Sequence, residues 1–477
     1  MPSRTVFVSG NFNVLHPGHL RLLRFARDCG HRLIVAVYTD RIAGKDAHVP
    51  EQLRLEGVQS NSWVDDAFLM DEPVANVIDR LRPDIVVKGK EHESRANPEL
   101  EPLGKYGGRL LFSSGETVFS SVDLLRKEFT ELDYRSIELP QDYLARHGIT
   151  SAELASLLQK FATIKVCVVG DLIVDEYITC EPLGMSQEDP TIVVSPLDSK
   201  RFIGGAGIVA AHAACLGAKS HFVSVTGKDA PREFAQAQLL EAGVQVSLLS
   251  DDSRPTTLKQ RFRCKGKTLL RVSHLHQGAI STQLQVRFIE RLEESIQGAN
   301  LLVFSDFNYG CLPQAMVNKI IPMAKARGLM LAADSQSSSQ VGDICRFKNM
   351  DLLTPTEREA RISTRNREDG LVVLAEAIRQ QSSARNILLK LGEEGLMIHA
   401  GNGGNSDWLT DRIGSLNSAP KDMAGAGDSL LIASALALAC GGNIWEAACL
   451  GSLAAAVQVG RVGNTPIKFE EIRQELG

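Results

Sequence analysis

Two histidines near the start of the chain stand three residues apart, where an apolar run gives way to a helical pattern. Pro17 suits the first turn of a helix because its φ is preset and it has no N–H, and Gly18 lets a ligand approach the backbone. His16 and His19 share one face of that turn, whose N–H groups and dipole favour an anion. The pattern predicts a site for a nucleoside triphosphate that is attacked at its α-phosphate while pyrophosphate leaves.

A second chemical pattern, Gly425-Ala426-Gly427-Asp428, precedes a long Ala- and Leu-rich run near the other end of the chain. Glycines at the start of a helix leave its N–H groups open to an anion. The helix dipole stabilises the Asp428 carboxylate in the first turn. Phosphoryl transfer to a hydroxyl needs donors for the phosphoryl group and an acceptor for the alcohol proton. The turn therefore predicts a kinase-type site with Asp428 as the base.

Strand and helix patterns alternate around the first motif. Buried-strand runs are expected at 4–10, 32–40, 83–89 and 108–114, and helices at 18–30 and 50–60. This alternation predicts a parallel sheet with crossover helices. We expect a Rossmann-like first domain over residues 1–130.

A polar stretch without a clear strand follows, and residues 131–163 are expected to form a linker and a leading helix with Glu153 in its first turn. A second, larger α/β domain is expected over 164–477, with ligands at the carboxyl ends of its strands. Segments 191–197 and 256–273 alternate apolar and polar residues instead, which predicts antiparallel strands and a small β lid. The fold class predicted is α/β, with two doubly wound domains and mainly parallel sheets.

Composition narrows the class of protein. The chain has 477 residues, 23% of them charged, and a net charge of −5, which gives no cationic field for nucleic acid. Nine cysteines are scattered singly, so a disulfide or zinc framework is not expected. No leader or apolar run long enough for a membrane span is evident, so we expect a cytoplasmic protein without a membrane partner.

The segment "GNFNVLHPGH" resembles the G-x-F-D-x-x-H-x-G-H signature of the nucleotidyltransferase superfamily, over about residues 4–130. The resemblance gives catalytic roles to His16, His19 and Lys45, with Lys45 and Arg54 at the phosphates. It places the nucleotide beside Gly10, Phe12, Gly18, Lys88, Gly89, Ser120 and Ser121. Asn13 and Phe119 depart from the family pattern, which has Asp and a small hydroxyl residue there.

The segments "GDLIVDEY", "FIGGAGIVAAHAACLGA", "DLLTPTERE" and "DMAGAGDSLL" occur in the order of the ribokinase-like (PfkB) sugar kinases, over about residues 164–470. This resemblance makes Asp428 the base and Gly425, Ala426 and Gly427 the anion hole. It places ATP near Lys390, Gly392 and Gly395, and Glu359 on Mg²⁺ through water. The sugar would face Asp175, Gly204 and Gly205.

Lys259, Arg261 and Arg271 would hold a phosphate that the sugar already carries, because cations at alternating strand positions converge on one face. A solvated edge strand remains the alternative for these three. Thr356 and Ile208 replace asparagines of the family pattern, and "ADSQS" replaces its D-P-K.

Within this family the segments look most like the heptose 7-phosphate kinases that are fused to a heptose 1-phosphate adenylyltransferase, but with the order of the two parts reversed. The resemblance implies a bifunctional enzyme of ADP-heptose synthesis for lipopolysaccharide. Its implied cofactors are Mg²⁺ and ATP, with CTP open for the first half and a monovalent cation open for the second. Small sugar phosphates and nucleotides are the implied partners, in a homodimer paired through the lid.

Two alternatives stay open. The first is a cytidylyltransferase fused to a kinase for another sugar or polyol. The second is a chain with one inactive, regulatory half, which the departures at Asn13, Phe119, Ile208 and Thr356 motivate. An RNA-binding or tRNA-charging protein is disfavoured by the acidic net charge.

Overall fold

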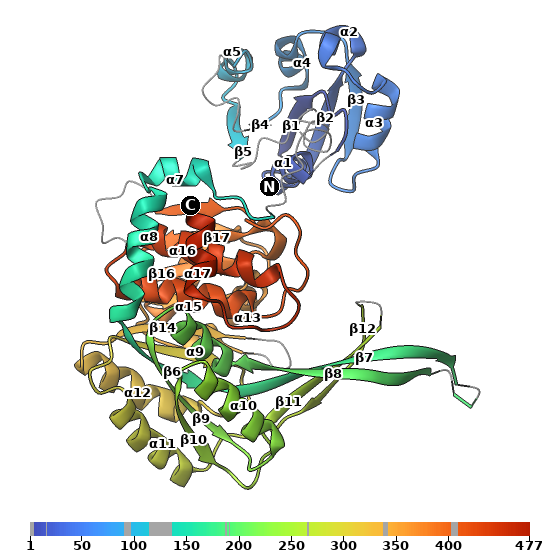
Figure 1. The fold of residues 1–477 in the computed structure, drawn as a ribbon. Coiled ribbons are helices and arrows are strands. Elements are labelled where there is room, and N and C mark those ends of the chain that lie inside the picture. The colour runs from blue at the N-terminus through green and yellow to red at the C-terminus, as the bar shows by residue number, and fades with distance from the viewer. Residues whose placement is uncertain are drawn as a thin grey trace. The chain divides into compact units, whose positions relative to one another are not determined.

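The computed structural model describes residues 4–15, 17–89, 97–113, 136–186, 188–189, 191–264, 267–336, 342–401 and 409–477. The chain divides into two compact units, residues 1–134 and 135–477, whose elements are labelled in Figure 1. The described elements of the first unit are β1 (Thr5–Gly10), α1 (Pro17–Asp28), β2 (Arg32–Tyr38), α2 (Asp40–Ala43), η1 (Gly44–Asp46), α3 (Glu51–Gln59), β3 (Asp66–Met70), α4 (Val74–Leu81), β4 (Ile85–Gly89), α5 (Leu100–Gly104) and β5 (Arg109–Ser113).

The first unit holds a five-stranded sheet in the order β3-β2-β1-β4-β5, and every pair in it is parallel. Val6 and Val8 of β1 pack on one face and Phe7 packs on the other, so both faces are buried. The strand order reverses between β1 and β4. Gly10 and Gly89 end these two strands, so the crevice where such sheets bind ligands opens beside them.

The second unit contains the remaining elements. They are α7 (Gln141–His147), α8 (Ser151–Gln159), η3 (Lys160–Thr163), β6 (Lys165–Gly170), β7 (Leu172–Met185), β8 (Ile192–Gly205), α9 (Ala206–Cys215), β9 (Lys219–Thr226), α10 (Ala230–Glu241), β10 (Gln245–Ser250), β11 (Thr257–Cys264), β12 (Lys267–His274), α11 (Thr282–Ser295), β13 (Leu301–Asp306), α12 (Gln314–Ala326), β14 (Met330–Ser335), η4 (Ile344–Arg346), β15 (Leu352–Leu353), α13 (Glu357–Thr364), α14 (Leu371–Ser382), β16 (Asn386–Lys390), η5 (Gly392–Glu394), β17 (Leu396–Ala400), β18 (Thr410–Ile413), α15 (Ala426–Ala439), α16 (Ile444–Val459) and α17 (Phe469–Leu476).

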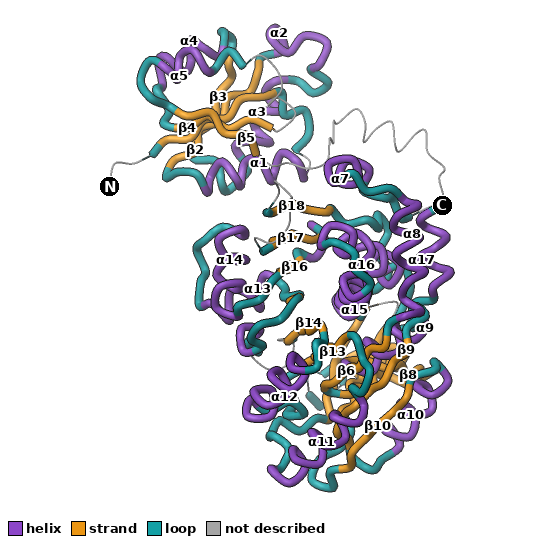
Figure 2. Tube along the Cα trace, turned by 90° about the vertical axis from the view of Figure 1, so that its left-hand side faces the viewer, coloured by secondary structure: helices purple, strands orange, loops and turns teal. Residues whose placement is uncertain are grey.

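Its main sheet has nine strands in the order β10-β9-β6-β13-β14-β15-β16-β17-β18, parallel from β10 to β16 and antiparallel at β17 and β18. Helices cover both faces, and Figure 2 shows α9 and α10 on one side of the strands and α11 and α12 on the other. Val166 and Val168 of β6 pack with the α9, α15 and α16 side. Cys167 and Val169 pack with the α11 and α12 side.

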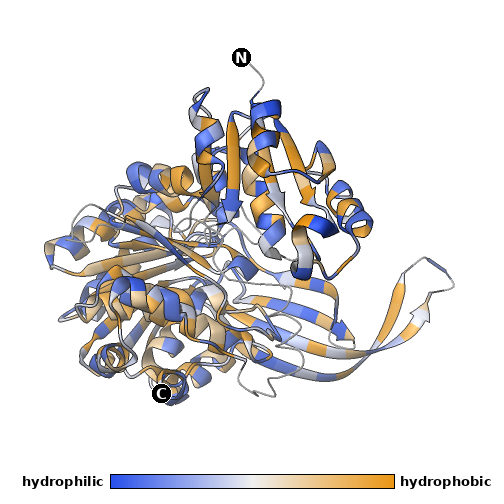
Figure 3. Ribbon diagram, turned by 90° about the horizontal axis from the view of Figure 1, so that it is seen from above, coloured by the Kyte–Doolittle hydropathy of each residue, from blue (hydrophilic) through white to orange (hydrophobic). Residues whose placement is uncertain are grey.

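A separate four-stranded sheet, in the order β12-β11-β7-β8, forms the lid. β7 continues from β6 after the single residue Asp171 and extends with β8 as a long arm (Figure 3). The pairs β7–β8 and β11–β12 are antiparallel as expected, but β11 runs parallel to β7. β7 follows β6 and β11 follows β10, so both lid strands start from the carboxyl edge of the main sheet and run in the same direction.

These sheets confirm the predicted α/β class with mainly parallel sheets and a small β lid. The predicted leading helix is α8, whose Thr150–Glu153 capping box matches the sequence signal. α7 was not expected, and Tyr143 and Leu144 bury it in the core of the second unit. Within the described residues, no helix combines the length and the apolar character needed to cross a membrane.

Candidate functional sites

The turn before α15 places the Gly-Ala-Gly motif at a helix N-terminus. Gly425 has φ 79°, and a Cβ there would lie 2.2 Å from Asn464 Oδ1, so only glycine fits. A Cβ on Gly427 would lie 3.1 Å from Lys390 Nζ, which shows how closely that ammonium approaches the turn. Asp428 is in the first turn and is 5% exposed. The turn thus joins outward N–H groups, a carboxylate and a cation.

Four charged groups from four strands act on Asp428: Asp334 of β14, Lys390 of β16, Asp175 of β7 and Lys259 of β11. Burial raises the pKa of Asp428 to about 8, and Asp334 adds to the rise while Lys390 opposes it. A carboxyl whose pKa lies near neutrality suits a general base. The fold therefore brings the predicted base together with the predicted residues Lys390, Asp175 and Lys259.

Lys390 is held by an ion pair, since its Nζ lies 2.7 Å from Asp334 Oδ2. Burial alone would lower the pKa of Lys390, but Asp334 and Glu359 outweigh it and the pKa is raised. The ammonium therefore stays protonated beside Gly427, where the γ-phosphate of ATP would develop charge.

Glu359 lies in the first turn of α13 and is 6% exposed. Its Oε2 accepts from the Thr356 N–H at 2.8 Å, and Thr356 Oγ1 accepts from the Glu359 N–H at 3.2 Å, which closes a capping box. Thr356, one of the departures from the family pattern, is thus the N-cap. Gly392 and Gly395 follow β16 with φ 63° and 89°, and a Cβ on Gly395 would lie 2.1 Å from Ile413 O.

The lid contributes a carboxylate and two cations. Asp175 is 6% exposed, and Arg261 Nη2 lies 3.4 Å from its Oδ1. A Cβ on Gly204 would come within 2.5 Å of Asp175 Oδ2, so the di-glycine lets β8 pass beside this carboxylate. Gly205 has φ 59° and its Cβ would lie 2.4 Å from Asp171 O. Arg271 pairs with Arg261 across β11 and β12 but is exposed.

An aromatic floor supports Lys259, whose Nζ lies 5.3 Å and 5.1 Å from the ring centroids of Phe307 and Tyr309. The loop that carries these rings is held by Asp171. Its buried carboxylate accepts N–H bonds from Phe307 at 2.9 Å, Tyr309 at 3.3 Å and Cys311 at 3.2 Å. The floor is therefore fixed to the residue that joins β6 to the lid.

Three contacts at this site involve residues that the sequence did not single out. Asp334 pairs with Lys390, Gln336 Nε2 donates to Asp428 Oδ1 at 3.1 Å, and Tyr177 Oη donates to Asp422 Oδ2 at 2.9 Å. The available signal was the position of Asp334 and Gln336 at the carboxyl end of a parallel strand, where ligand-binding residues gather.

In the first unit, Gly10 ends β1 and Phe12 takes φ 50° in the loop before α1. The Phe12 ring is 3% exposed and packs 5.1 Å from the His19 ring, measured between centroids. His19 Nδ1 bonds Val14 O at 3.0 Å, which fixes the imidazole over the first turn that contains Gly18. His16, Ser120 and Ser121, together with Phe119, lie outside the described residues.

Arg54 is 1% exposed and has all three guanidinium nitrogens bonded within the protein. They donate to Val49 O at 2.7 Å, Asn11 O at 2.7 Å and Asp40 Oδ1 at 2.5 Å. This geometry gives Arg54 a structural task at the site, the joining of three loops. Its contact with a phosphate stays a prediction.

Two predicted lysines differ in their surroundings. Lys45 is exposed in η1. Lys88 Nζ lies 2.8 Å from the buried carboxylate of Glu99, directly before Gly89 at the strand-order reversal. The fold thus brings Gly10, Lys88 and Gly89 to neighbouring strand ends.

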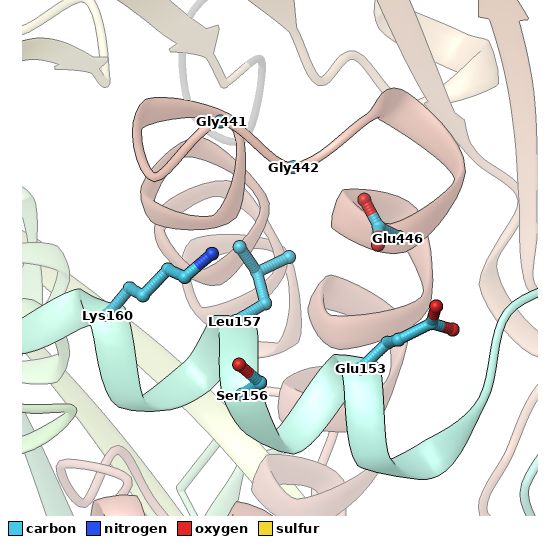
Figure 4. A pocket seen from close by; sticks show the side chains of 7 residues that line it. All are labelled: Glu153, Ser156, Leu157, Lys160, Gly441, Gly442 and Glu446. Atoms are coloured by element: carbon cyan, nitrogen blue, oxygen red, sulfur yellow. The ribbon is translucent and has the colours of Figure 1, made fainter.

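A hollow of about 180 Å³ lies between α8 and the α15–α16 turn (Figure 4). It lies at the opposite end of α15 from Asp428, about 20 Å away along a helix of that length. Its two carboxylates, Glu153 and Glu446, each close a helix capping box. The hollow is therefore a structural groove apart from the candidate sites.

Comparison with known proteins identifies both halves. Residues 163–470 match the model of the pfkB family carbohydrate kinases, and residues 7–106 match the cytidylyltransferase-like model. A relative from Bradyrhizobium diazoefficiens, named bifunctional protein HldE, is 29% identical over 328 residues, which are 67% of this chain and 64% of that protein. A relative of the same name from Helicobacter hepaticus is 28% identical over 321 residues, which are 65% of this chain and 64% of that protein. The chain spans less than two thirds of the length of these relatives.

Solved structures share the fold of the larger unit. Arabidopsis thaliana ribokinase, in complex with ribose and ATP, matches with a TM-score of 0.51 and 19% identity over 66% of this chain and 98% of its own. Escherichia coli phosphofructokinase-2 matches with a TM-score of 0.52 and 16% identity over the same shares. The family model covers well over half of the chain. The chain therefore belongs to the pfkB family of carbohydrate kinases and carries a cytidylyltransferase-like domain ahead of its kinase domain.

Proposed function

We propose that residues 164–477 transfer the γ-phosphoryl group of ATP to the anomeric hydroxyl of a sugar phosphate, with heptose 7-phosphate as the first candidate. The observation that carries this proposal is the buried Asp428 carboxylate at the N-terminus of α15, with the Lys390 ammonium beside Gly427. Asp428 takes the hydroxyl proton, and the sugar oxygen attacks the phosphorus as the bond to ADP breaks.

The lid supplies the sugar side of this site. Asp175 would accept hydrogen bonds from sugar hydroxyls, and Lys259 and Arg261 would hold the phosphate already on the sugar. Arg271 is exposed on β12, so it would reach that phosphate only from the rim of the site. The resemblance of the segments 171–177 and 255–272 to the heptose 7-phosphate kinases is the reason for taking a heptose as the first candidate.

Metal ions fit the residues present at this site. Glu359 is a buried carboxylate close enough to Lys390 to raise its pKa, and it would hold the waters of a Mg²⁺ that neutralises charge on the ATP phosphates. Next to Gly425, the buried Asn464 Oδ1 has no hydrogen-bond partner among the residues that the structure describes, and such an oxygen suits a monovalent cation under the proposed anion hole.

The first unit would join a nucleotide to a sugar 1-phosphate and release pyrophosphate, with His16, His19 and Lys45 at the triphosphate. ATP is the first candidate nucleotide, from the resemblance to the heptose 1-phosphate adenylyltransferases. CTP is the second candidate, because the matching family model is the cytidylyltransferase-like one.

The test is ³¹P NMR of the full chain with Mg-ATP, Mg-CTP and a panel of sugar phosphates. Asp428→Asn should abolish sugar phosphorylation and spare pyrophosphate release from a supplied sugar 1-phosphate. His16→Ala or His19→Ala should do the reverse. Asp198→Asn, which changes an exposed lid carboxylate, should leave both reactions intact. Loss of both reactions in one folded variant would contradict independent sites.

Homodimer formation through the lid is supported by apolar side chains on the arm of β7 and β8 (Figure 3). Leu183, Met185, Ile192 and Leu197 are 63%, 60%, 60% and 64% exposed. A soluble protein seldom leaves such a group uncovered. Met185→Lys with Ile192→Lys should convert a dimer into a monomer in light scattering, whereas a monomeric parent chain would contradict the dimer.

A further inference from the structure

Gln336 donates a hydrogen bond to the side chain of Asp428. It follows β14 directly, and its Nε2 donates to Asp428 Oδ1 at 3.1 Å. Within the described part of the chain, this is the one hydrogen bond that the Asp428 carboxylate accepts. The groups that face Asp428 from the surrounding strands, Asp334, Lys390, Asp175 and Lys259, act on it through charge.

The backbone of Gln336 is held in place, which fixes the point from which its side chain reaches Asp428. The Gln336 N–H donates to Asp306 O at 2.8 Å, and Asn308 Nδ2 donates to Gln336 O at 3.0 Å. Asp306 is fixed in turn by Ser335 Oγ at 2.8 Å and by Arg346 Nη2 at 2.8 Å. The backbone of Gln336 is therefore anchored by a chain of bonds that does not involve Asp428, and the side-chain amide reaches from this fixed point to the carboxylate.

We propose that Gln336 is the positioning residue of the kinase reaction, holding Asp428 Oδ1 so that Oδ2 faces the acceptor hydroxyl. This inference rests on the proposed kinase function. The hydroxyl proton passes to Oδ2 as the sugar oxygen bonds to the γ-phosphorus, and the electron pair of the breaking P–O bond leaves with ADP. An amide suits this task because it orients a carboxylate without neutralising it.

A cation at residue 336 would act differently. It would stabilise the ionised carboxylate, lower its pKa and make it a weaker base. Removal of the Gln336 amide would leave the ionised Asp428 carboxylate with one hydrogen bond fewer and would raise the pKa of Asp428. The two changes therefore shift the pH dependence of the reaction in opposite directions.

The experiment is the pH profile of kcat/KM for sugar phosphorylation in the full chain. Gln336→Leu should move the acidic limb up by about half to one pH unit and lower kcat at pH 7 about 3- to 10-fold, with KM for ATP unchanged. Gln336→Lys should move the limb down. The matched control is Gln238→Leu, which removes an exposed amide of α10 whose Nε2 also donates to one carboxylate, Glu241 Oε2 at 3.0 Å, and it should leave the profile unchanged.

A profile of Gln336→Leu that coincides with that of the parent chain, or a shift in the same direction for both variants, overturns the proposal. A parent chain that phosphorylates no member of the sugar phosphate panel contradicts the proposed function instead. In that case a double-mutant cycle, which needs no substrate, still tests the hydrogen bond between Gln336 and Asp428. It compares the unfolding free energies of the parent chain, Gln336→Leu, Asp428→Asn and the double variant. The coupling energy should be larger at pH 9, where the carboxylate is ionised, than at pH 6, and its absence at pH 9 overturns the proposal.

Discussion

At the scale of residues, the proposed base Asp428 also affects the stability of the chain. Its folded-state pKa, about 8, lies above the ordinary value of a carboxyl, so the folded state binds this proton more tightly than the unfolded chain. Stability contributed by the bound proton is therefore lost as the pH rises from about 4 to 8. Asp428→Asn replaces the buried carboxyl with a neutral amide that does not ionise at high pH, and it should therefore raise the unfolding free energy at pH 9 by about 1–3 kcal/mol. Urea unfolding at pH 5 and pH 9 checks this, and an equal gain for Asp198→Asn would contradict it.

Arg54 leads to a second residue-scale prediction. Arg54→Met removes three hydrogen bonds, to the carbonyl oxygens of Asn11 and Val49 and to the half-exposed carboxylate of Asp40, and should destabilise the first unit by about 2–4 kcal/mol. Hydrogen–deuterium exchange of the β1 and β2 peptides reports this unit by itself. The control is Arg41→Met, since Arg41 and its partner Asp71 are 70% and 58% exposed and the change should stay within about 0.5 kcal/mol. Equal effects of both variants would show that the three bonds of Arg54 contribute nothing.

A site residue can be predicted from the sequence when its role depends on local backbone conformation, and it cannot when its role depends on residues that are distant in the sequence. The Gly-Ala-Gly-Asp turn could be predicted because its function depends on local backbone conformation, which four adjacent residues encode. The partners of that turn could not, since Asp334 meets Lys390 and Gln336 meets Asp428 only after distant strands pair. The exposure of Arg271 and the burial of Arg54 also depend on packing that spacing alone does not encode.

At the scale of elements, a hydrogen bond from Tyr177 of β7 to Asp422 ties the lid to the turn that precedes α15. Asp422 also accepts the N–H groups of Ala424 at 3.1 Å and Gly463 at 3.0 Å, so it shapes the chain that leads to Gly425. Tyr177→Phe should lower kcat/KM for the sugar about 3- to 10-fold while the melting temperature changes little.

Steady-state kinetics in both substrates checks this prediction. Tyr106→Phe is the matched control, because its hydroxyl also bonds one oxygen, Pro83 O at 3.0 Å, but in the first unit. A loss of activity in Tyr106→Phe as large as in Tyr177→Phe would contradict a specific link between lid and turn.

Sequence reasoning missed β3, α4 and α7, and none of these elements contains a long apolar run. β3 and α4 are short. α7 is buried by contacts with residues far along the chain, such as the bond from Tyr143 Oη to Trp445 O at 2.9 Å. Strands with long apolar runs were predicted well, because a strand buried on both faces needs apolar residues at every position. The parallel pairing of β11 with β7 depends on the path of the chain between sheets, which no local pattern records.

At the scale of the whole molecule, the kinase fold begins before its family match at residue 163. Tyr143, Leu144, Leu154, Leu157, Leu158 and Phe161 are buried in its core. Arg146 and His147 bond Asp411 Oδ2 at 3.0 Å and 2.8 Å. A fragment of residues 164–477 exposes the surface that these side chains cover, at about 1.5–3 kcal/mol for each. It should aggregate or unfold, whereas residues 136–477 should give a cooperative thermal transition, and equal melting temperatures would contradict this.

The three N–H bonds that Asp171 accepts have a mechanical consequence. One carboxylate fastens the root of the arm and the aromatic floor into a single rigid piece, so the arm cannot pivot there without dragging Phe307 and Tyr309 along. Product departure then requires flexing farther out, and the register shift between Thr179 and Cys180 is where the ladder of β7 and β8 is already broken. At the proposed kinase site, the part of the arm that moves when a sugar enters or leaves would therefore be its outer span, while its root stays in place.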